Sequence, residues 1–423
     1  MERLISAFGV IVLLGIAWAW SSNRRGVPLR VVVWGTLLQL LLAVFVLQVP
    51  AGTALFQNIG KGVTWLLSFA NSGAVFLFGN IASSSDQHRL VFGMQFALTV
   101  LPIIVFLSSL TAVLYHLGLM QRVVRAMAWV MQRTMRTSGI ESLAAAANVF
   151  LGQTEAPLLI RHYLPAATTT ELFAVMVGGF ATIAGSIMGV YIAMGIPATS
   201  LIVASLLAAP GSLVLAKIAE PPTDTPSEQQ GDTPGVTIML EDPVVPSQNV
   251  VDALSRGALD GFTIAINVLM VLLAFTAVVA LVDASLSGLA EVTASWGWSA
   301  MPRSLNEIFA VLFYPLAWLT GVPAQEVSAL SGLLGVKLSQ TEFLAYDQLS
   351  QMIASGQLSD RTVQIATVAL CGFANVMSIG IQIGGFGIMV PDKRSEVARL
   401  AFKAMCIGAL ANLLAACIVG IVA

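Results

Sequence analysis

The sequence predicts an all-α polytopic membrane protein with about eight transmembrane helices, two re-entrant hairpins and an internal inverted repeat with broken helices. Composition is the first observation: of 423 residues, 57% are hydrophobic and only 10% are charged, and the mean hydropathy is +0.87. Soluble proteins carry roughly a quarter of their residues as Asp, Glu, Lys and Arg. The second is the length of the apolar runs. Val31–Val49 and Phe262–Val282 match the roughly 20 residues that a helix needs to cross a bilayer.

The same composition excludes several classes of function. A net charge of −2 argues against a nucleic-acid partner, which needs a basic face. The three cysteines lie in apolar segments without a CxxC spacing, and the three histidines are scattered, so neither a disulfide framework nor a metal centre built from them is expected. The chain has no HExxH motif and no nucleophile–base pair at membrane depth, so we expect no catalytic residues and no enzyme.

Eight apolar windows predict the transmembrane helices. They cover residues 4–20, 31–49, 92–118, 172–194, 198–218, 262–283, 362–390 and 404–422. The first window could be confused with a signal peptide. It lacks a basic N-terminal region, however, and Trp18 and Trp20 stand where small residues should precede a cleavage site. We therefore interpret it as a retained span.

Between the spans lie apolar stretches of a different kind. Residues 62–82, 123–137 and 304–320 are interpreted as interfacial or partly buried helices. Residues 140–162 and 324–350 are apolar but interrupted by Gly, Pro and carboxylates. Irregular backbone at membrane depth is tolerated where it is buried in protein or lines a cavity, so these two stretches are predicted to be re-entrant hairpins.

Basic residues predict the orientation of the chain. If the N-terminus faces outward, 14 of the 20 Lys and Arg residues fall in inside loops, and Lys337 is among those assigned to outside loops. Because cytoplasmic loops carry an excess of Lys and Arg, both termini are predicted to lie outside. The predicted location is the inner or plasma membrane, in contact with the lipid bilayer.

An acidic, Pro-rich segment divides the chain. Residues 220–248 contain six prolines and six acidic residues but no basic residue, a composition that cannot bury a core. The predicted organisation has four parts: N-terminal scaffold spans (1–118), a first repeat half (119–219), a disordered cytoplasmic linker (220–249) and a second repeat half (250–423).

The two halves share two short motifs in the same order. Gly152-Gln153-Thr154-Glu155 corresponds to Ser339-Gln340-Thr341-Glu342, and Gly179-Phe180-Ala181-Thr182 corresponds to Gly372-Phe373-Ala374-Asn375. Three predicted spans lie between the two QTE motifs, so the second copy is inverted relative to the first. An inverted repeat with interrupted helices indicates a secondary-transporter binding site near the bilayer midplane.

The carboxylates of the QTE motifs are the first candidate site residues. Polar groups at membrane depth are costly and persist mainly where they face a cavity or one another. Glu155 and Glu342 each follow an amide and a hydroxyl, a set of donors and acceptors that suits a neutral, polyhydroxylated or heterocyclic ligand. The alternative is a buried packing network in which Glu155 pairs with Arg161.

Glycine-rich breaks in the fourth and seventh spans are the second candidate feature. Glycine weakens a helix and exposes backbone carbonyl groups, which can bind a cation where the helix unwinds. Thr182 and Ser186 stand at the first break, and Asn375 and Ser378 stand at the second.

Structural interpretations stay open for several residues near these breaks. Gly185 and Gly189 are four residues apart, a spacing that is also typical of close helix packing. Phe373 could offer its ring to a planar base or pack within the span. Asn148 could ligate an ion or cap a helix of the hairpin.

On these motifs the chain resembles the concentrative nucleoside transporter family over nearly its whole length. The resemblance is carried by Asn148-Val-Phe-Leu-Gly-Gln-Thr-Glu-Ala-Pro157, by Thr341-Glu342-Phe343 and by Gly372-Phe-Ala-Asn-Val-Met-Ser-Ile-Gly-Ile-Gln-Ile-Gly-Gly385. It implies eight spans plus two opposed re-entrant hairpins. It also implies a homotrimer in which each protomer has a scaffold part and a moving transport part.

The resemblance implies roles for three sets of residues. The nucleobase would be bound by Gln153, Thr154 and Glu155 of hairpin one, directly or through water. Ile187 and Phe373 would pack near it. The ribose hydroxyls would be held by Glu342, Asn375 and Ser378. The sodium site of the family is matched by the side chains of Asn148 and Thr182 and the carbonyl groups of Leu151 and Ile183.

The expected activity is sodium-coupled symport, in which nucleosides are imported by alternating access. Thr341 stands where the family often has Asn, and Val376-Met377-Ser378 stands where it commonly has Phe-Ser-Ser, so the preference for purine or pyrimidine bases stays open. The amide of Asn148 and the hydroxyl of Thr182 favour sodium as the coupling ion. The alternative is a proton-coupled importer of the same fold, with Glu155 or Glu342 taking the proton.

Overall fold

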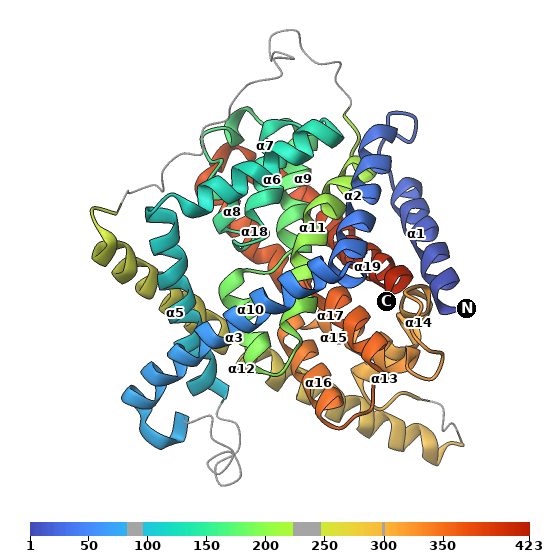
Figure 1. Ribbon diagram of the computed structural model, residues 1–423. Coiled ribbons are helices and arrows are strands. Elements are labelled where there is room, and N and C mark those ends of the chain that lie inside the picture. The colour runs from blue at the N-terminus through green and yellow to red at the C-terminus, as the bar shows by residue number, and fades with distance from the viewer. Residues whose placement is uncertain (83–95, 223–246, 298–300) are drawn as a thin grey trace.

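Every regular element of the described chain is helical. The computed structural model describes residues 1–82, 96–222, 247–297 and 301–423 (Figure 1). The first half contains α1 (Glu2–Ala19), α2 (Leu29–Leu47), α3 (Pro50–Phe78), η1 (Gly79–Ala82), α5 (Phe96–His116), α6 (Leu119–Met135), α7 (Gly139–Ala147), α8 (Glu155–Leu158), η2 (Leu164–Ala166), α9 (Thr169–Ala181), α10 (Gly185–Ala193) and α11 (Ala198–Ala219). The second half contains α12 (Val250–Ser295), α13 (Leu305–Leu312), α14 (Tyr314–Leu319), α15 (Val327–Ser339), α16 (Glu342–Ala354), α17 (Asp360–Leu370), α18 (Val376–Met389), η3 (Pro391–Lys393) and α19 (Arg394–Val422). Residues 223–246, most of the predicted linker, lie outside the described residues.

Seven of the predicted spans coincide with segments that are long and apolar enough to cross a membrane. Within the described ranges these are α1, α2, α5, α9 with α10, α11, α12, and η3 with α19. The eighth predicted span, residues 362–390, is divided into α17 and α18 by residues 371–375, and each part is too short to span alone. The 46 residues of α12 measure about 69 Å, so the predicted span 262–283 is only its middle portion.

The remaining predicted helices are also present, with shifted boundaries. Residues 62–82 belong to the longer helix α3, which begins at Pro50. Residues 123–137 correspond to α6, and residues 304–320 correspond to α13 and α14. The predicted hairpins each contain two helices, α7 with α8 and α15 with α16, while their re-entrant position in a bilayer stays a prediction.

A bundle of α9, α11, α17 and α19 forms the interior. Each of these helices packs on the others, apart from α9 and α17, whose ends meet at the breaks described below. In their most apolar stretches, 83% of the residues are buried in α11 and in α19, against 6% in α12. The interior helices therefore carry the polar site, whereas most of the apolar surface of α12 faces away from the protein.

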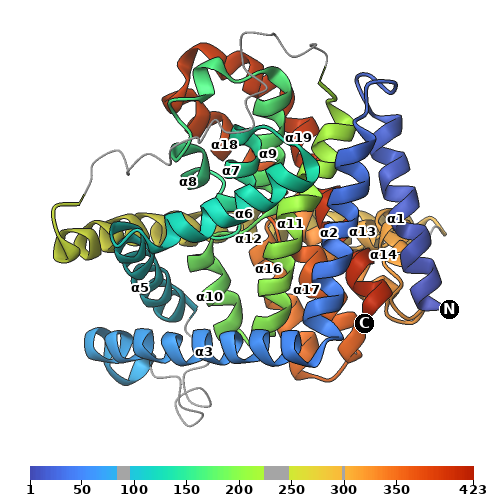
Figure 2. The ribbon, with the colours of Figure 1, turned by 45° about the horizontal axis from the view of Figure 1, so that its top comes forward.

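Small residues explain how α12 packs against α5, beside which it lies in Figures 1 and 2. A Cβ atom on Gly261 would lie 2.9 Å from the Cα atom of Val105, and one on Gly257 would lie 2.7 Å from the carbonyl oxygen of Ser108. Glycines four residues apart allow two helix backbones to approach closely in a membrane. These two helices therefore form a pair at the edge of the bundle.

The two termini lie side by side, as both views show (Figures 1 and 2). Nε of Arg3 donates to the carbonyl oxygen of Ala423 at 3.0 Å, and the guanidinium of Arg361 donates to the same oxygen at 2.8 Å. Both termini therefore lie on the same side of the protein. Which side of the membrane this is stays a prediction.

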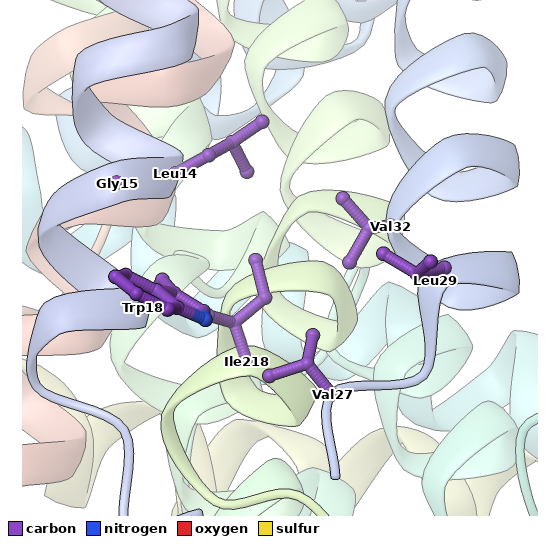
Figure 3. A pocket seen from close by; sticks show the side chains of 7 residues that line it. All are labelled: Leu14, Gly15, Trp18, Val27, Leu29, Val32 and Ile218. Atoms are coloured by element: carbon purple, nitrogen blue, oxygen red, sulfur yellow. The ribbon is translucent and has the colours of Figure 1, made fainter. Parts of the chain in front are cut away.

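A surface pocket between α1, α2 and α11 is apolar and separate from the polar site (Figure 3). It has a volume of about 250 Å³ and is lined by Leu14, Gly15, Trp18, Val27, Leu29, Val32 and Ile218. Among these side chains only the Trp18 indole has a polar atom, and it donates to the carbonyl oxygen of Arg24 at 3.2 Å. The lining therefore offers little to a polar ligand.

Candidate functional site

The two interrupted helices meet at their breaks. Residues 182–184 separate α9 from α10, and residues 371–375 separate α17 from α18. The N–H of Phe373 donates to the carbonyl oxygen of Thr182 at 3.2 Å. The two copies of the repeated motif are thus in direct contact, and this contact brings the candidate residues of both halves together.

Side-chain caps determine where the helices of the second half restart. Oδ1 of Asn375 accepts the N–H of Ser378 at 2.8 Å and begins α18. The hydroxyl of Thr341 accepts the N–H of Leu344 at 3.3 Å and begins α16. Asn and Thr satisfy unpaired N–H groups at helix starts. In each case the sequence itself sets the end of the break, and the cap leaves the Asn375 amide nitrogen available to the site.

The tip of hairpin one lies against the first break. The N–H of Gly185 donates to the carbonyl oxygen of Phe150 at 2.9 Å. A Cβ atom on Gly179 would lie 3.0 Å from Cβ of Gln153 and 2.8 Å from Nε2 of Gln382. A side chain at position 179 would therefore keep hairpin one and α18 away from α9.

The three consecutive polar residues of hairpin one are at this junction. Gln153 is buried, and its Oε1 has no hydrogen-bond partner among the described residues. Cγ2 of Thr154 lies 3.1 Å from the place that a Cβ atom on Gly385 would occupy, so it faces α18. Oε2 of Glu155 accepts the N–H of Gly152 at 3.1 Å. Together they offer an amide, a hydroxyl and a carboxylate to a ligand at this point.

The alternative interpretations of this region have different outcomes. No ion pair joins Glu155 to Arg161 in the part of the chain that the structure describes, and Nε of Arg161 donates instead to Nε2 of His162 at 3.0 Å. A Cβ atom on Gly189 would collide with the side chain of Leu107, which supports the packing role of that glycine.

Glu342 is buried and is held by two donors. Nδ2 of Asn375 donates to its Oε2 at 2.7 Å, and the hydroxyl of Tyr191 donates to its Oε1 at 3.3 Å. The ring of Tyr191 packs against Tyr346 and Phe343, with centroid distances of 4.2 Å and 5.3 Å. Donors from α10 and from the second break therefore orient this carboxylate from both repeats.

Asn148 ends α7, and its side chain is fully buried next to the first break. Neither Nδ2 nor Oδ1 has a hydrogen-bond partner among the described residues. Its Nδ2 lies 3.0 Å from the place of a Cβ atom on Gly178, whose carbonyl oxygen accepts the hydroxyl of Thr182 at 2.9 Å. Buried amides are normally hydrogen-bonded, so this one requires a partner.

Two backbone carbonyl oxygens belong to the same set of predicted cation ligands as Asn148 and Thr182. No hydrogen bond from the described residues engages the carbonyl oxygens of Leu151 or Ile183, which flank the contact between hairpin one and the break. Side-chain and carbonyl oxygens at an unwound helix are the ligands that sodium-coupled transporters use. The set Asn148, Leu151, Thr182 and Ile183 therefore fits a small cation.

The other predicted residues lie on the same elements. Ile187 is buried on α10, Ser378 is buried on α18, and Phe373 is half-buried at the second break. The structure thus places all the predicted residues on the hairpins and broken helices.

Four buried polar residues of this region were not singled out from the sequence: Tyr191, Lys337, Gln382 and Asn412. The assignment of Lys337 to an outside loop was wrong, because it lies in the last turn of α15 and is 1% exposed. The sequence signal that could have identified them is a polar side chain within an apolar segment. Burying such a side chain in a membrane is energetically unfavourable, so its presence indicates a function.

Family models match most of the chain. The models described as Na+ dependent nucleoside transporter N-terminus and C-terminus match residues 8–81 and 200–420, and a gate model described as nucleoside recognition matches residues 97–198.

Curated relatives match along the whole chain. An uncharacterized transporter of Haemophilus influenzae is 41% identical over 100% of this chain and 98% of its own length. Nucleoside permease NupC of Helicobacter pylori is 37% identical over 99% and 98%. Human sodium/nucleoside cotransporter 1 is 39% identical over 99% of this chain, which spans only 64% of that longer protein.

Solved structures match the fold. CNTnw in an inward-facing substrate-bound state is 40% identical, with a TM-score of 0.90 over 100% of this chain and 98% of that chain. Variants of CNTnw in an outward-facing state and in an intermediate state match with TM-scores of 0.90 and 0.91.

Proposed function

Because the chain belongs to the concentrative, or Na+ dependent, nucleoside transporter family, and is therefore a multi-pass membrane transporter and not an enzyme, we propose that it imports nucleosides by sodium-coupled symport. The observation that supports this proposal most directly is the buried amide of Asn148. It has no hydrogen-bond partner among the described residues and lies next to Gly178, close to the break between α9 and α10. A cation bound there would join hairpin one to the first break.

Sodium acts in this proposal as a co-substrate held by Asn148, Thr182 and the carbonyl groups of Leu151 and Ile183. Its binding would stabilise the conformation in which hairpin one presents its polar residues to the ligand. A ligand that binds one conformation better shifts the population toward it. Coupling then has a physical cause, because the nucleoside would bind best to the population that sodium has selected.

The nucleoside would lie between the two hairpins. Gln153, Thr154 and Glu155 would form hydrogen bonds with the base, and Ile187 and Phe373 would pack near it. Glu342, Asn375 and Ser378 would hold the ribose hydroxyls. An ionised carboxylate has about four acceptor positions, so Glu342 keeps capacity for hydroxyl donors after accepting from Tyr191 and Asn375.

A proton is the alternative coupling ion. The observation that favours it is that Glu155 accepts the backbone N–H of Gly152 at 3.1 Å, and no cation pairs with this carboxylate in the described chain. In that case Glu155 or Glu342 would take up the proton, and the fold and substrate class would be unchanged.

Uptake into proteoliposomes tests the proposal. Radiolabelled uridine and adenosine would be supplied with an inward sodium gradient or a matched potassium control, at fixed pH, and in a separate series with an acidic exterior and no sodium. We expect accumulation that requires sodium. Accumulation without sodium but with an acidic exterior would move the coupling to a proton. Correctly inserted protein that accumulates neither nucleoside would contradict nucleoside transport itself.

Assembly and orientation belong to the same proposal. We expect a homotrimer with both termini outside, in which the exposed apolar surface of α12 meets lipid or another protomer. The pair formed by α5 and α12 supports a separate scaffold part. However, α1 and α2 pack on α19 and α11, so the scaffold boundary at residue 118 needs its own test by cross-linking.

A further inference from the structure

A buried lysine and a buried asparagine together contact the C-terminal ends of α17 and α9. Lys337 lies in the last turn of α15. Its Nζ donates to the carbonyl oxygen of Ala369, near the end of α17, at 2.9 Å, and to Oδ1 of Asn412 at 2.7 Å. Nδ2 of Asn412, on α19, donates to the carbonyl oxygen of Cys371 at 2.5 Å and to that of Ala181, the last residue of α9, at 2.7 Å.

Lys337 and Asn412 supply hydrogen-bond donors to carbonyl groups that the broken helices leave unpaired. The last carbonyl groups of a helix have no partner within the helix and carry a partial negative charge, which a nearby cation stabilises. An ammonium group supplies three donors and an amide supplies two. Lys337 and Asn412 therefore satisfy carbonyl groups at both breaks with one connected set of hydrogen bonds.

The two breaks leave no room for another side chain between them. A Cβ atom on Gly372 would lie 2.8 Å from the carbonyl oxygen of Phe180 and 2.9 Å from that of Ala181. The amide of Asn412 thus bridges two backbones that are already in close contact. A shift of one break would be transmitted to the other.

Lys337 differs from the other buried lysine of the described chain. Lys217 forms an ion pair with the buried carboxylate of Glu141. No carboxylate among the described residues forms an ion pair with Lys337. A buried charge is costly unless it is compensated. Here the compensation comes from the carbonyl oxygen of Ala369, near the end of α17, and from Oδ1 of Asn412.

The lysine is connected to the predicted ribose subsite by two routes. Along the chain, Lys337 and Glu342 flank the turn between α15 and α16. Through space, the carbonyl oxygens of Ala369 and Cys371 are anchored immediately before residues 372–375, and Asn375 then donates to Glu342 at 2.7 Å. Both routes end at the same carboxylate.

We propose that Lys337, acting through Asn412, is a positioning residue of the ribose subsite. It anchors the end of α17 so that Asn375 and Glu342 present their polar atoms to the ribose hydroxyls. The inference rests on the proposed function, because it takes the ligand to be a nucleoside. Lys337 itself makes no contact with the ligand.

Comparing the binding of two ligands distinguishes a positioning role of Lys337 from a general effect on protein stability. Binding to the purified full-length protein, at saturating sodium, would be measured for uridine or adenosine, whichever binds tighter, and for its 2′,3′-dideoxy analogue. The analogue lacks the hydroxyls that Glu342 would accept. Wild type is expected to prefer the complete nucleoside by about 10- to 100-fold, the range for hydrogen bonds to a charged group.

The variant Lys337→Met retains the length of the side chain and removes its charge. We expect it to bind the complete nucleoside more weakly while binding the dideoxy analogue nearly as wild type does, so that the preference falls to about threefold or less. Lys217→Met is the matched control. It leaves Glu141 unpaired and lowers stability, yet it should retain the full preference between the two ligands.

Other outcomes would overturn the inference. If Lys337→Met weakens both ligands by the same factor or keeps the full preference, the lysine has only a structural role. Asn412→Ser, which keeps the lysine and removes the amide, gives the same readout if Lys337→Met does not fold. A wild-type protein that binds both ligands equally would exclude the ribose subsite at Glu342, and one that binds no nucleoside would exclude the proposed function.

Discussion

The hydroxyl of Tyr191 donates to Oε1 of Glu342 at 3.3 Å, and this bond joins α10 of the first repeat to hairpin two of the second. Asn375 holds the other carboxylate oxygen at 2.7 Å. A buried carboxyl group that accepts one donor on each oxygen has little freedom to rotate. The position of this carboxylate therefore depends on contacts between the repeats as well as on its own helix.

The contribution of this bond can be measured with Tyr191→Phe. The change removes the hydroxyl and retains the ring that packs on Tyr346 and Phe343. A net hydrogen bond contributes about 0.5–1.5 kcal/mol, so nucleoside affinity should fall by about 2- to 10-fold. Tyr346→Phe is the control, because its hydroxyl donates to the carbonyl oxygen of Thr367 at 2.7 Å instead. An equal loss in both variants would exclude a special role for the Tyr191 bond.

Neutralising the second carboxylate should stop transport. Glu342→Gln retains the shape but removes the charge, and hydrogen bonds to charged groups contribute about 1.5–3 kcal/mol each. Uptake in proteoliposomes should fall to less than about a tenth of wild type while membrane insertion is unchanged. Glu326→Gln is the control, since Glu326 accepts from the hydroxyl of Ser359 at 2.8 Å, outside the site. Wild-type uptake in Glu342→Gln would remove this residue from the site.

The sodium assignment predicts a selective effect of Thr182→Val. Valine retains the side-chain shape and removes an oxygen from the proposed cation ligands. The sodium concentration for half-maximal uptake should rise by about tenfold, the effect of losing about 1.4 kcal/mol of binding. Thr170→Val alters the same helix at its other end, where the hydroxyl donates to the carbonyl oxygen of Pro221 at 3.4 Å, and should leave this concentration unchanged. If Thr170→Val raises this sodium concentration more than Thr182→Val does, the proposed sodium site is contradicted.

Close packing at the first break predicts that Gly179→Ala impairs uptake. The added methyl group would lie 2.8 Å from Nε2 of Gln382 and 3.0 Å from Cβ of Gln153. Overpacking of this kind costs about 1–3 kcal/mol and would push the tip of hairpin one away from α9. Gly384→Ala, on α18, meets no atom within 4 Å and should transport as wild type does. Equal uptake by both variants would show that the hairpin tip adapts.

Local features of the sequence accounted for the helices and for much of the candidate site. The length of an apolar run determines whether a helix can span a bilayer, and this property does not depend on distant residues. Asn375 and Thr341 begin helices through bonds to residues three positions ahead. Glu155 and Glu342 were recognisable because an acid within an apolar segment is costly unless it faces a cavity or a partner.

Long-range contacts could not be predicted in the same way. Lys337 was interpreted as a loop residue because the neighbouring sequence gives no sign that Ala369 of α17 and Asn412 of α19 provide its acceptors. The same holds for Tyr191 and Gln382, whose partners, Glu342 and the carbonyl oxygen of Met176, lie more than a hundred residues away along the chain.

Hydropathy, caps and helix breaks act over a few residues, and they were enough to predict a helical membrane protein with two interrupted helices. Packing of segments far apart in the chain was needed to show that the breaks meet at Thr182 and Phe373 and that Lys337 and Asn412 satisfy their carbonyl groups. A broken helix leaves backbone oxygens unpaired, and the donor that satisfies them is chosen by packing in space and not by position in the chain.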